Sequence, residues 1–141
     1  MQGFELEFEA NSVICREGDP SSDLYFLQSG KLLVCTISGT QVKAISRISP
    51  GEFVGELSFF DGRARSSHIV TLEKSKLIQI PKNEISPLLP SWYIQIGMNM
   101  TKKIRLLDQV IHNSKLRLSN AEESKPLSIE EQRKFYDLLT N

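Results

Sequence analysis

Short runs of β-branched and aromatic residues, separated by Gly, Pro, Asp and Ser, fill the chain between about residues 12 and 80. Runs of this kind are typical of antiparallel strands joined by tight turns. Many short strands at such spacing favour closure into a barrel or sandwich, because closure leaves few sheet edges exposed. The sequence therefore predicts a mainly β fold, an antiparallel jelly-roll-like β-roll with flanking helices. Strands are expected at residues 12–15, 24–28, 32–37, 42–48, 68–72 and 77–80.

Length and charge narrow the possible functions. A chain of 141 residues fits one domain with a single core. Lys and Arg together number 17, as do Asp and Glu, so no net positive field favours nucleic acid or an anionic membrane. No segment stays apolar long enough to span a bilayer, and the N-terminus does not resemble a signal peptide, so a cytoplasmic location is expected. Cys15 and Cys35 do not form a disulfide framework or a metal-ligand spacing, which predicts reduced structural thiols.

The pattern becomes helical after residue 80. A short helix is expected within residues 81–89, where Pro87 weakens the pattern, and Pro90-Ser91 is typical of the entry to a long helix. Ser114 interrupts the apolar stripe of this long helix. The stripe either packs on the chain's own barrel or pairs with a second copy, and we favour a homodimer. Its apolar residues are Met100, Ile104, Leu107, Ile111 and Leu118.

The last part of the chain predicts a linker and a terminal helix. Residues 119–126 are polar, and residues 128–131 match a capping box ahead of Phe135, Leu138 and Leu139. The apolar residues of this helix either dock on the domain or bind a partner. We therefore expect a domain at residues 1–118 that includes the long helix, and a linker with a short helix at residues 119–141.

Residues 51–67 combine groups suited to a nucleotide. Gly55 allows the backbone to approach a ligand closely, and a helical turn that opens near Glu56 aims amide N–H groups at an anion. Arg65 offers a planar fork of donors to phosphate oxygens. The carboxylate of Glu56 only accepts hydrogen bonds, so beside a phosphate it suits a sugar hydroxyl. Arg63 is the competing cation, which we expect to be a solvated loop residue.

A family resemblance rests on this segment. Gly55-Glu56-Leu57-Ser58, followed by Arg65 nine positions after Glu56, resembles the phosphate-binding cassette of cyclic-nucleotide-binding domains. Residues 13–20 and 24–30 are similar to the first strands and turns of that family, so the resemblance covers roughly residues 10–118. Its best-known members are of the catabolite activator type and the protein kinase A regulatory subunit type.

The resemblance implies an eight-stranded β-roll in which Glu56 holds the ribose 2′-hydroxyl and Arg65 holds the cyclic phosphate. Backbone amides around Leu57 and Ser58 would assist, and the hydroxyl of Ser66 or Ser67 would reach the phosphate or the purine. The implied ligand is cAMP or cGMP, of which we favour cAMP.

Two other regions bear on the pocket. His68 departs from the small or hydroxyl residue that is common in the family, and we expect its ring to face outward. The family often closes the pocket with the long helix. Val110, Ile111 and Asn113 are the candidates here for covering the base, and the residues leave the choice between them open.

Four other interpretations compete with the sensor. Glu56 and Arg65 could be an ordinary surface ion pair, which contributes about 0–1 kcal/mol. An enzyme or metal site lacks support, because the only histidines, His68 and His112, are far apart and no nucleophile and base pair is evident. A helix-turn-helix regulator needs more than the 23 residues after Leu118.

The fourth interpretation is a protein-interaction scaffold that keeps the fold and does not use the nucleotide. The preferred interpretation is a stand-alone, non-enzymatic sensor without a metal or other cofactor. It binds a cyclic nucleotide and signals to an effector protein through rearrangement of the helices after Pro81.

Overall fold

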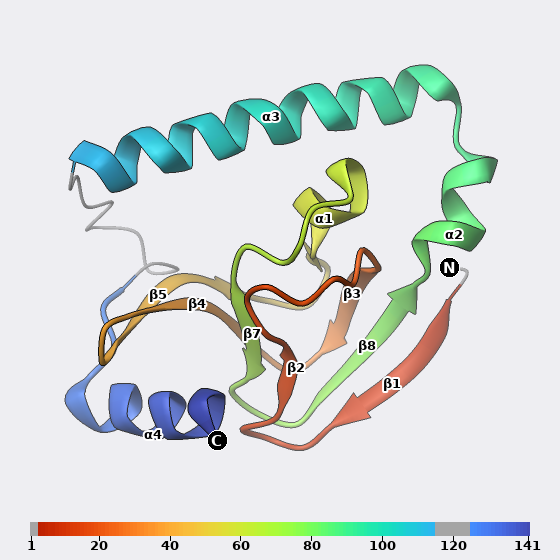
Figure 1. Ribbon diagram of the computed structural model, residues 1–141. Helices are drawn as coiled ribbons and strands as arrows, with labels where there is room; N and C mark the ends of the chain where they lie inside the picture. The colour runs from red at the N-terminus through yellow and green to blue at the C-terminus, as the bar shows by residue number, and fades with distance from the viewer. Residues whose placement is uncertain (1–2, 115–124) are drawn as a thin grey trace.

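The computed structural model describes residues 3–114 and 125–141, with the side chains of residues 112–114 excepted. The described strands form two four-stranded antiparallel sheets, in the orders β1-β8-β3-β6 and β2-β7-β4-β5 (Figure 1). The predicted β-roll is therefore confirmed. The strands are β1 (Phe4–Phe8), β2 (Val13–Cys15), β3 (Leu24–Ser29), β4 (Leu32–Ser38), β5 (Gln41–Ile48), β6 (Phe53–Val54), β7 (His68–Thr71) and β8 (Ser75–Ile80).

All six predicted strands are present, with bounds within two residues of those expected. Two further strands were missed. β1 pairs with β8, where Phe4 lies opposite Gln79, and the two-residue β6 pairs with β3. Both lie at the edges of the same sheet. The strand count of the implied eight-stranded roll is thus correct.

The main core lies between the two sheets. Leu27 and Leu77 from one sheet and Leu32 from the other are completely buried in a single cluster. Alternation of inward and outward side chains along the strands places these residues on the inner faces. Cys15 belongs to this cluster and Cys35 is also buried; both are free thiols. Burial raises the pKa of Cys15 to about 11 and that of Cys35 to about 12, so both thiols stay protonated at neutral pH.

Helices connect and cover the sheets. α1 (Glu56–Asp61) leads from β6 toward β7. After β8 come α2 (Lys82–Ile85), a 3-10 turn η1 (Ser86–Leu88) and the long α3 (Ser91–Ser114), as the prolines predict. α1 lies between α3 and the sheets (Figure 1). Among the described residues, no helix has both the length and the apolar character that crossing a membrane requires.

α3 contacts α1 through a small and polar face. A Cβ placed on Gly97 would lie 2.1 Å from the Phe60 ring, so the glycine permits close approach of the two helices. Thr101, one turn later, is buried. Arg105 then forms a two-point ion pair with Asp61, with N–O distances of 2.5 and 3.1 Å. These contacts hold α3 against α1 rather than against a strand.

Three of the predicted stripe residues of α3 are exposed, while Ile111 is half-buried. Met100, Ile104 and Leu107 all keep large exposed fractions, 61% for Leu107. The interpretation that these three residues pack on the chain's own barrel is therefore wrong. The pairing with a second copy stays a prediction, and Leu118 lies outside the described residues.

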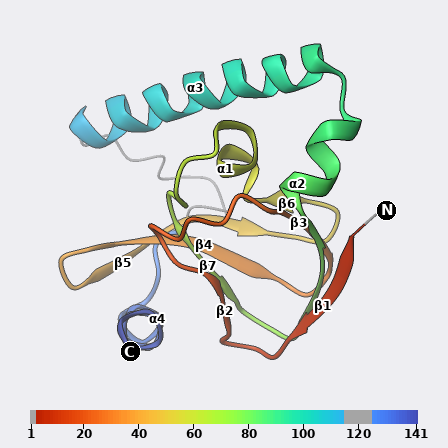
Figure 2. The ribbon, with the colours of Figure 1, turned by 45° about the vertical axis from the view of Figure 1, so that its right-hand side comes forward.

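The terminal helix α4 (Ile129–Thr140) docks on the outer face of the second sheet. Ser128 and Glu131 form the predicted capping box, with both reciprocal hydrogen bonds at 3.1 Å. Phe135 is completely buried against Leu33 and Val70, and Leu138 and Leu139 pack in the same cluster. Figure 2 shows α4 almost end-on, on the side of the roll away from α3. Of the two open roles for this helix, docking on the domain is the one observed.

Candidate functional site

Gly55 stands at the turn between β6 and α1. Its φ of 86° lies in the left-handed region, which favours glycine. A Cβ at this position would lie 2.4 Å from Arg65 Nη1 and 3.0 Å from Asp23 O. Glycine is therefore needed here for both its backbone conformation and its lack of a side chain. The same turn starts α1 at Glu56, as the sequence predicted.

The side chain of Arg65 is held in the interior by neutral groups. Its residue is only 4% exposed. Nη1 donates to Gly55 O at 3.2 Å, and Nη2 donates to Asp23 O at 2.5 Å and to Ser21 Oγ at 3.2 Å. The guanidinium also lies 5.8 Å from the centroid of the Tyr25 ring. None of these partners carries a negative charge.

One donor of this buried cation is unused. Arg65 Nε is buried and has no hydrogen-bond partner, and it is the only such side-chain nitrogen or oxygen in the part of the chain that the structure describes. A buried donor without a partner costs about 1–3 kcal/mol, and more on a charged group. The arrangement therefore favours an anion at Nε. It also excludes the interpretation of Arg65 as half of a surface ion pair with Glu56.

The backbone of Arg65 is fixed by a turn in the N-terminal part of the chain. Its N–H donates to Asp19 O and its carbonyl accepts from the Gly18 N–H, both at 2.8 Å. This turn follows β2, and the Arg16 N–H closes it on the Asp19 carboxylate. The backbone position of Arg65 is thus set by hydrogen bonds to residues more than 40 positions earlier in the sequence.

Glu56 lies beside a pocket of about 380 Å³. Glu56 is exposed as a residue, but neighbouring groups partly desolvate its carboxyl and so raise its pKa, and the charge of Glu52 adds to this. The Glu56 N–H and the charge of Arg65 act in the opposite direction. The carboxylate is therefore poised to gain from a hydroxyl donor. The lining residues are Leu24, Glu52, Phe53, Glu56, Phe60 and Tyr93.

The other predicted site residues belong to the same segment. In α1, Leu57 is half-buried and Ser58 is buried. Ser66 is exposed and Ser67 is half-buried, in the stretch before β7. Arg63 is exposed, and its N–H donates to Asp61 Oδ1. The expectation that Arg63 is a solvated loop residue is thus confirmed.

His68 faces away from the inner core, as expected, but it is enclosed and not solvated. The residue is 8% exposed, and its Nδ1 accepts a hydrogen bond of 3.1 Å from the Glu17 N–H. The turn after β2 covers the start of β7, so a side chain pointing away from the inner core is still enclosed. Burial lowers the pKa of His68, while the charge of Glu17 acts against this. The residue has a structural partner and does not line the pocket of Glu56.

The long helix reaches this pocket through its first turn. Tyr93, in the first turn of α3, lines the wall, with its ring 6.4 Å from that of Phe60. Val110 and Ile111 are not lining residues, and the side chain of Asn113 lies outside the described part. Sequence reasoning missed Tyr93, although an aromatic residue directly after the predicted helix entry was a usable signal.

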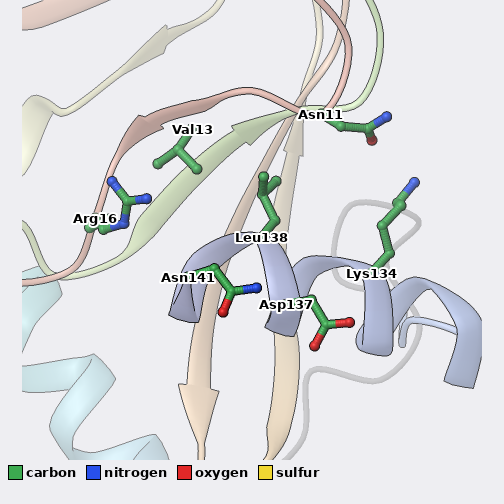
Figure 3. Close-up of a pocket in the computed structure, with 7 residues that line it drawn as sticks. All are labelled: Asn11, Val13, Arg16, Lys134, Asp137, Leu138 and Asn141. Carbon is green, nitrogen blue, oxygen red and sulfur yellow. The ribbon is translucent and has the colours of Figure 1, made fainter.

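A second, larger groove of about 520 Å³ lies between β2 and α4 (Figure 3). It mixes the basic Arg16 and Lys134 with the acidic Asp137. All three charged residues are exposed, so no desolvated charge there favours a ligand. No group of three or more potential metal ligands occurs in the described residues 3–111 and 125–141. The turn at Gly55 is therefore the better candidate site.

Two known proteins are similar to this chain in sequence. The chain is 28% identical over 102 residues to lysophospholipase NTE1 of Mycosarcoma maydis, covering 70% of this chain and 5% of that protein. It is 24% identical over 87 residues to the cAMP-dependent protein kinase regulatory subunit of Dictyostelium discoideum, covering 59% of this chain and 27% of that protein. The chain thus spans a minor part of these relatives.

A solved structure and a family model are also similar to this chain. The regulatory domain of Toxoplasma gondii PKA, in a co-crystal structure with cAMP, matches with a TM-score of 0.59 and 23% identity over 61% of this chain and 33% of that one. This similarity shows the same fold. The family model described as the cyclic nucleotide-binding domain matches residues 5–91, more than half of the chain. The chain belongs to the cyclic nucleotide-binding domain family.

Proposed function

We propose that this chain is a sensor module that binds a cyclic purine mononucleotide at the turn of Gly55. Arg65 donates to the cyclic phosphate and Glu56 accepts from the ribose 2′-hydroxyl. The observation that carries the proposal is the buried, unpartnered Nε of Arg65. A phosphate oxygen at Nε satisfies this donor and adds the counter-charge that the neutral partners of the guanidinium lack.

The turn supplies the remaining phosphate contacts. Gly55 permits a close approach of the backbone, and the first-turn N–H groups of α1, among them those of Leu57 and Ser58, have no partner within the helix. The hydroxyl of Ser66 or Ser67 adds a donor near the phosphate or the base. With Glu56 and Arg65, these residues form the proposed site.

The base occupies the pocket beside Glu56. Leu24, Phe53, Phe60 and Tyr93 present apolar or aromatic groups to it, which suits the faces of a purine. Tyr93 is the proposed cover, in place of the residues near the end of α3. We favour cAMP over cGMP, in agreement with the cAMP in the similar Toxoplasma structure. No metal or other cofactor is part of the proposal.

The output is a movement of helices. Because α3 is held on α1 by the Phe60–Gly97 contact and the Asp61–Arg105 ion pair, a shift of α1 on ligand binding passes to α3. The module then acts on an effector protein and is not itself an enzyme. Its proposed extent is residues 1–118, with residues 119–141 as linker and docked helix. A cytoplasmic location stays a prediction from the sequence.

The exposed apolar face of α3 supports a homodimer. Met100, Ile104 and Leu107 lie on one side of the helix, and all three are exposed. A second copy would bury them, and the effector is the other possible occupant of the face. Sedimentation velocity tests the dimer: Leu107→Glu should convert it to a monomer. A wild-type monomer at all concentrations contradicts the dimer.

Calorimetric titration with cAMP and with cGMP tests the proposed function. We expect heat of binding with the wild-type protein, loss of it with Arg65→Ala, and retention of it with the matched control Arg63→Ala. Absence of heat with both nucleotides contradicts the sensor and leaves the scaffold as the interpretation. Binding that survives Arg65→Ala unchanged shows that the phosphate contact is misassigned.

A further inference from the structure

The turn of residues 16–19, which follows β2, is attached at two adjacent points to the segment that carries Arg65. Its Glu17 N–H donates to His68 Nδ1 at 3.1 Å, and the next N–H along the chain, that of Gly18, donates to Arg65 O at 2.8 Å. The Arg65 N–H donates in return to Asp19 O at 2.8 Å. One short turn therefore holds both the His68 ring and the backbone of Arg65.

This turn lies at the surface, so packing contributes little to its position. Arg16, Glu17 and Gly18 are exposed, and Asp19 is half-buried. The Arg16 N–H donates to the Asp19 carboxylate and the Asp19 N–H donates to Arg16 O, both within the turn. His68 is only 8% exposed and begins β7, which is paired on both sides, with β2 and with β4. The ring is therefore a fixed point to which the turn is attached.

The hydrogen bond from Glu17 requires a neutral His68 ring. Nδ1 accepts only when it carries no proton, so the neutral ring is the Nε2–H tautomer. Protonation places a hydrogen on Nδ1 that faces the Glu17 N–H, and two donors at this distance repel. The Glu17 carboxylate lies 3.8 Å from Nε2, where it attracts the charged ring. Protonation thus exchanges a backbone attachment for a contact with a flexible side chain.

We propose that neutral His68 is a positioning residue for the nucleotide site, which holds the 16–19 turn and through it the backbone of Arg65, so that protonation of the ring weakens nucleotide binding. The inference rests on the proposed function, since it concerns the affinity of the site at Arg65. His68 does not line the pocket, so it acts through the turn and not on the ligand.

The charged groups that face the ring all belong to the turn. Burial has the largest effect and lowers the pKa of His68 below its ordinary value of 6.5. The charge of Glu17 opposes this, that of Arg16 adds to it, and that of Asp19 opposes it. The net lowering favours the neutral ring, which is the form that accepts from the turn.

The strands on either side of β7 contribute thiols. Cys35 of β4 lies opposite His68, and Cys15 of β2 lies opposite the next residue of β7. Burial raises the pKa of both thiols, to about 11 for Cys15 and about 12 for Cys35, so neither changes charge where the ring does. The lowered pKa of His68 means that its attachment of the turn is complete above its ordinary value of 6.5. The attachment is lost as the pH falls through the lowered value.

Two variants of His68 test the inference by calorimetric titration with cAMP. In His68→Asn the amide oxygen replaces Nδ1 and accepts from the Glu17 N–H at every pH. Between about pH 7.5 and about pH 5, the affinity of wild type should fall at least about threefold more than that of His68→Asn. Protonation of Glu56 lowers the affinity of both proteins alike, so the difference belongs to His68.

His68→Phe removes the acceptor at every pH. It should bind cAMP about threefold or more weakly than wild type at about pH 7.5, and equal wild type at about pH 5, where the wild-type ring has also lost the contact. Equal pH profiles in wild type and His68→Asn overturn the inference. Binding by His68→Phe as tight as that of wild type at the higher pH also overturns it.

NMR of the wild-type protein separates this inference from the proposed function and does not depend on the folding of a His68 variant. If neither nucleotide gives heat of binding, the proposed function fails, and the NMR titration still decides whether His68 positions Arg65. The chain has two histidines, so His112→Gln assigns the ring signals. The His68 ring should be the Nε2–H tautomer at neutral pH, and the amide signals of Gly18 and Arg65 should titrate with the midpoint of that ring. A Nδ1–H tautomer, or an Arg65 amide that does not follow the ring, overturns the inference.

Discussion

Replacing Gly55 with alanine tests whether the turn is shaped around Arg65. At φ 86° an alanine costs about 1–2 kcal/mol because of the left-handed backbone. Its Cβ also meets Arg65 Nη1 at 2.4 Å, which forces the guanidinium away from the Gly55 carbonyl. Loss of a hydrogen bond from a charged donor costs about 1.5–3 kcal/mol. The expected destabilisation is therefore about 2.5–5 kcal/mol.

Gly51→Ala is the matched control. Gly51 has a φ of 95°, and a Cβ there meets no atom within 4 Å. This variant carries only the backbone cost of about 1–2 kcal/mol. Urea unfolding of the two variants and of wild type measures the difference, which isolates the collision with Arg65. cAMP affinity should fall by about tenfold or more in Gly55→Ala and change little in Gly51→Ala. Equal destabilisation and equal affinity in both variants would refute the reasoning.

Three further predictions concern ionisation, the α1–α3 contact and α4. The pKa of Glu56 is raised by partial desolvation of its carboxyl, and a ribose hydroxyl favours its charged form, so cAMP affinity should fall as pH drops through that pKa; calorimetry over pH should show a flatter profile for Glu56→Gln. Burial raises the pKa of Asp61, but hydrogen bonds from Arg105 and the Arg63 N–H, with their charges, outweigh it and lower the pKa overall. The resulting stability is present at neutral pH and is lost as pH falls through the lowered pKa; Asp61→Asn should cost about 1–3 kcal/mol in urea unfolding at pH 7 and little at a pH where Asp61 is protonated. Phe135→Ala should cost about 3–5 kcal/mol, against less than about 0.5 kcal/mol for the exposed Ile129→Ala, with cAMP affinity unchanged in both; a small effect of Phe135→Ala would show that α4 does not dock in solution.

Local patterns in the sequence were sufficient for most of the fold. Turn residues and apolar runs located six strands, and Pro90-Ser91 and the Ser128 capping box located two helices, because these signals act over a few residues. β1 also carries a local signal, the alternation of Phe4, Leu6 and Phe8, which the prediction overlooked. β6 has two residues, too few for any periodicity, and exists because β3 offers it a partner.

The sequence was sufficient to predict which residues form the candidate site, but not which distant residues surround them. Glycine and arginine at this spacing identify the turn, but the burial of Arg65 depends on Ser21 and Asp23, more than 40 residues earlier. The enclosure of His68 has the same cause, a turn that arrives from a distant part of the chain. Tyr93 reaches the pocket only because Gly97 lets α3 lie close to α1. Contacts of this kind arise from tertiary packing and leave no periodic pattern.

A crystal structure of the protein with cAMP tests the central claim most directly. We predict an oxygen of the cyclic phosphate within hydrogen-bond distance of Arg65 Nε, and the ribose 2′-hydroxyl on the Glu56 carboxylate. The guanidinium should keep at least one of its bonds to Gly55 O and Asp23 O. A nucleotide bound in the groove between β2 and α4, or with its phosphate away from Arg65, would contradict the account.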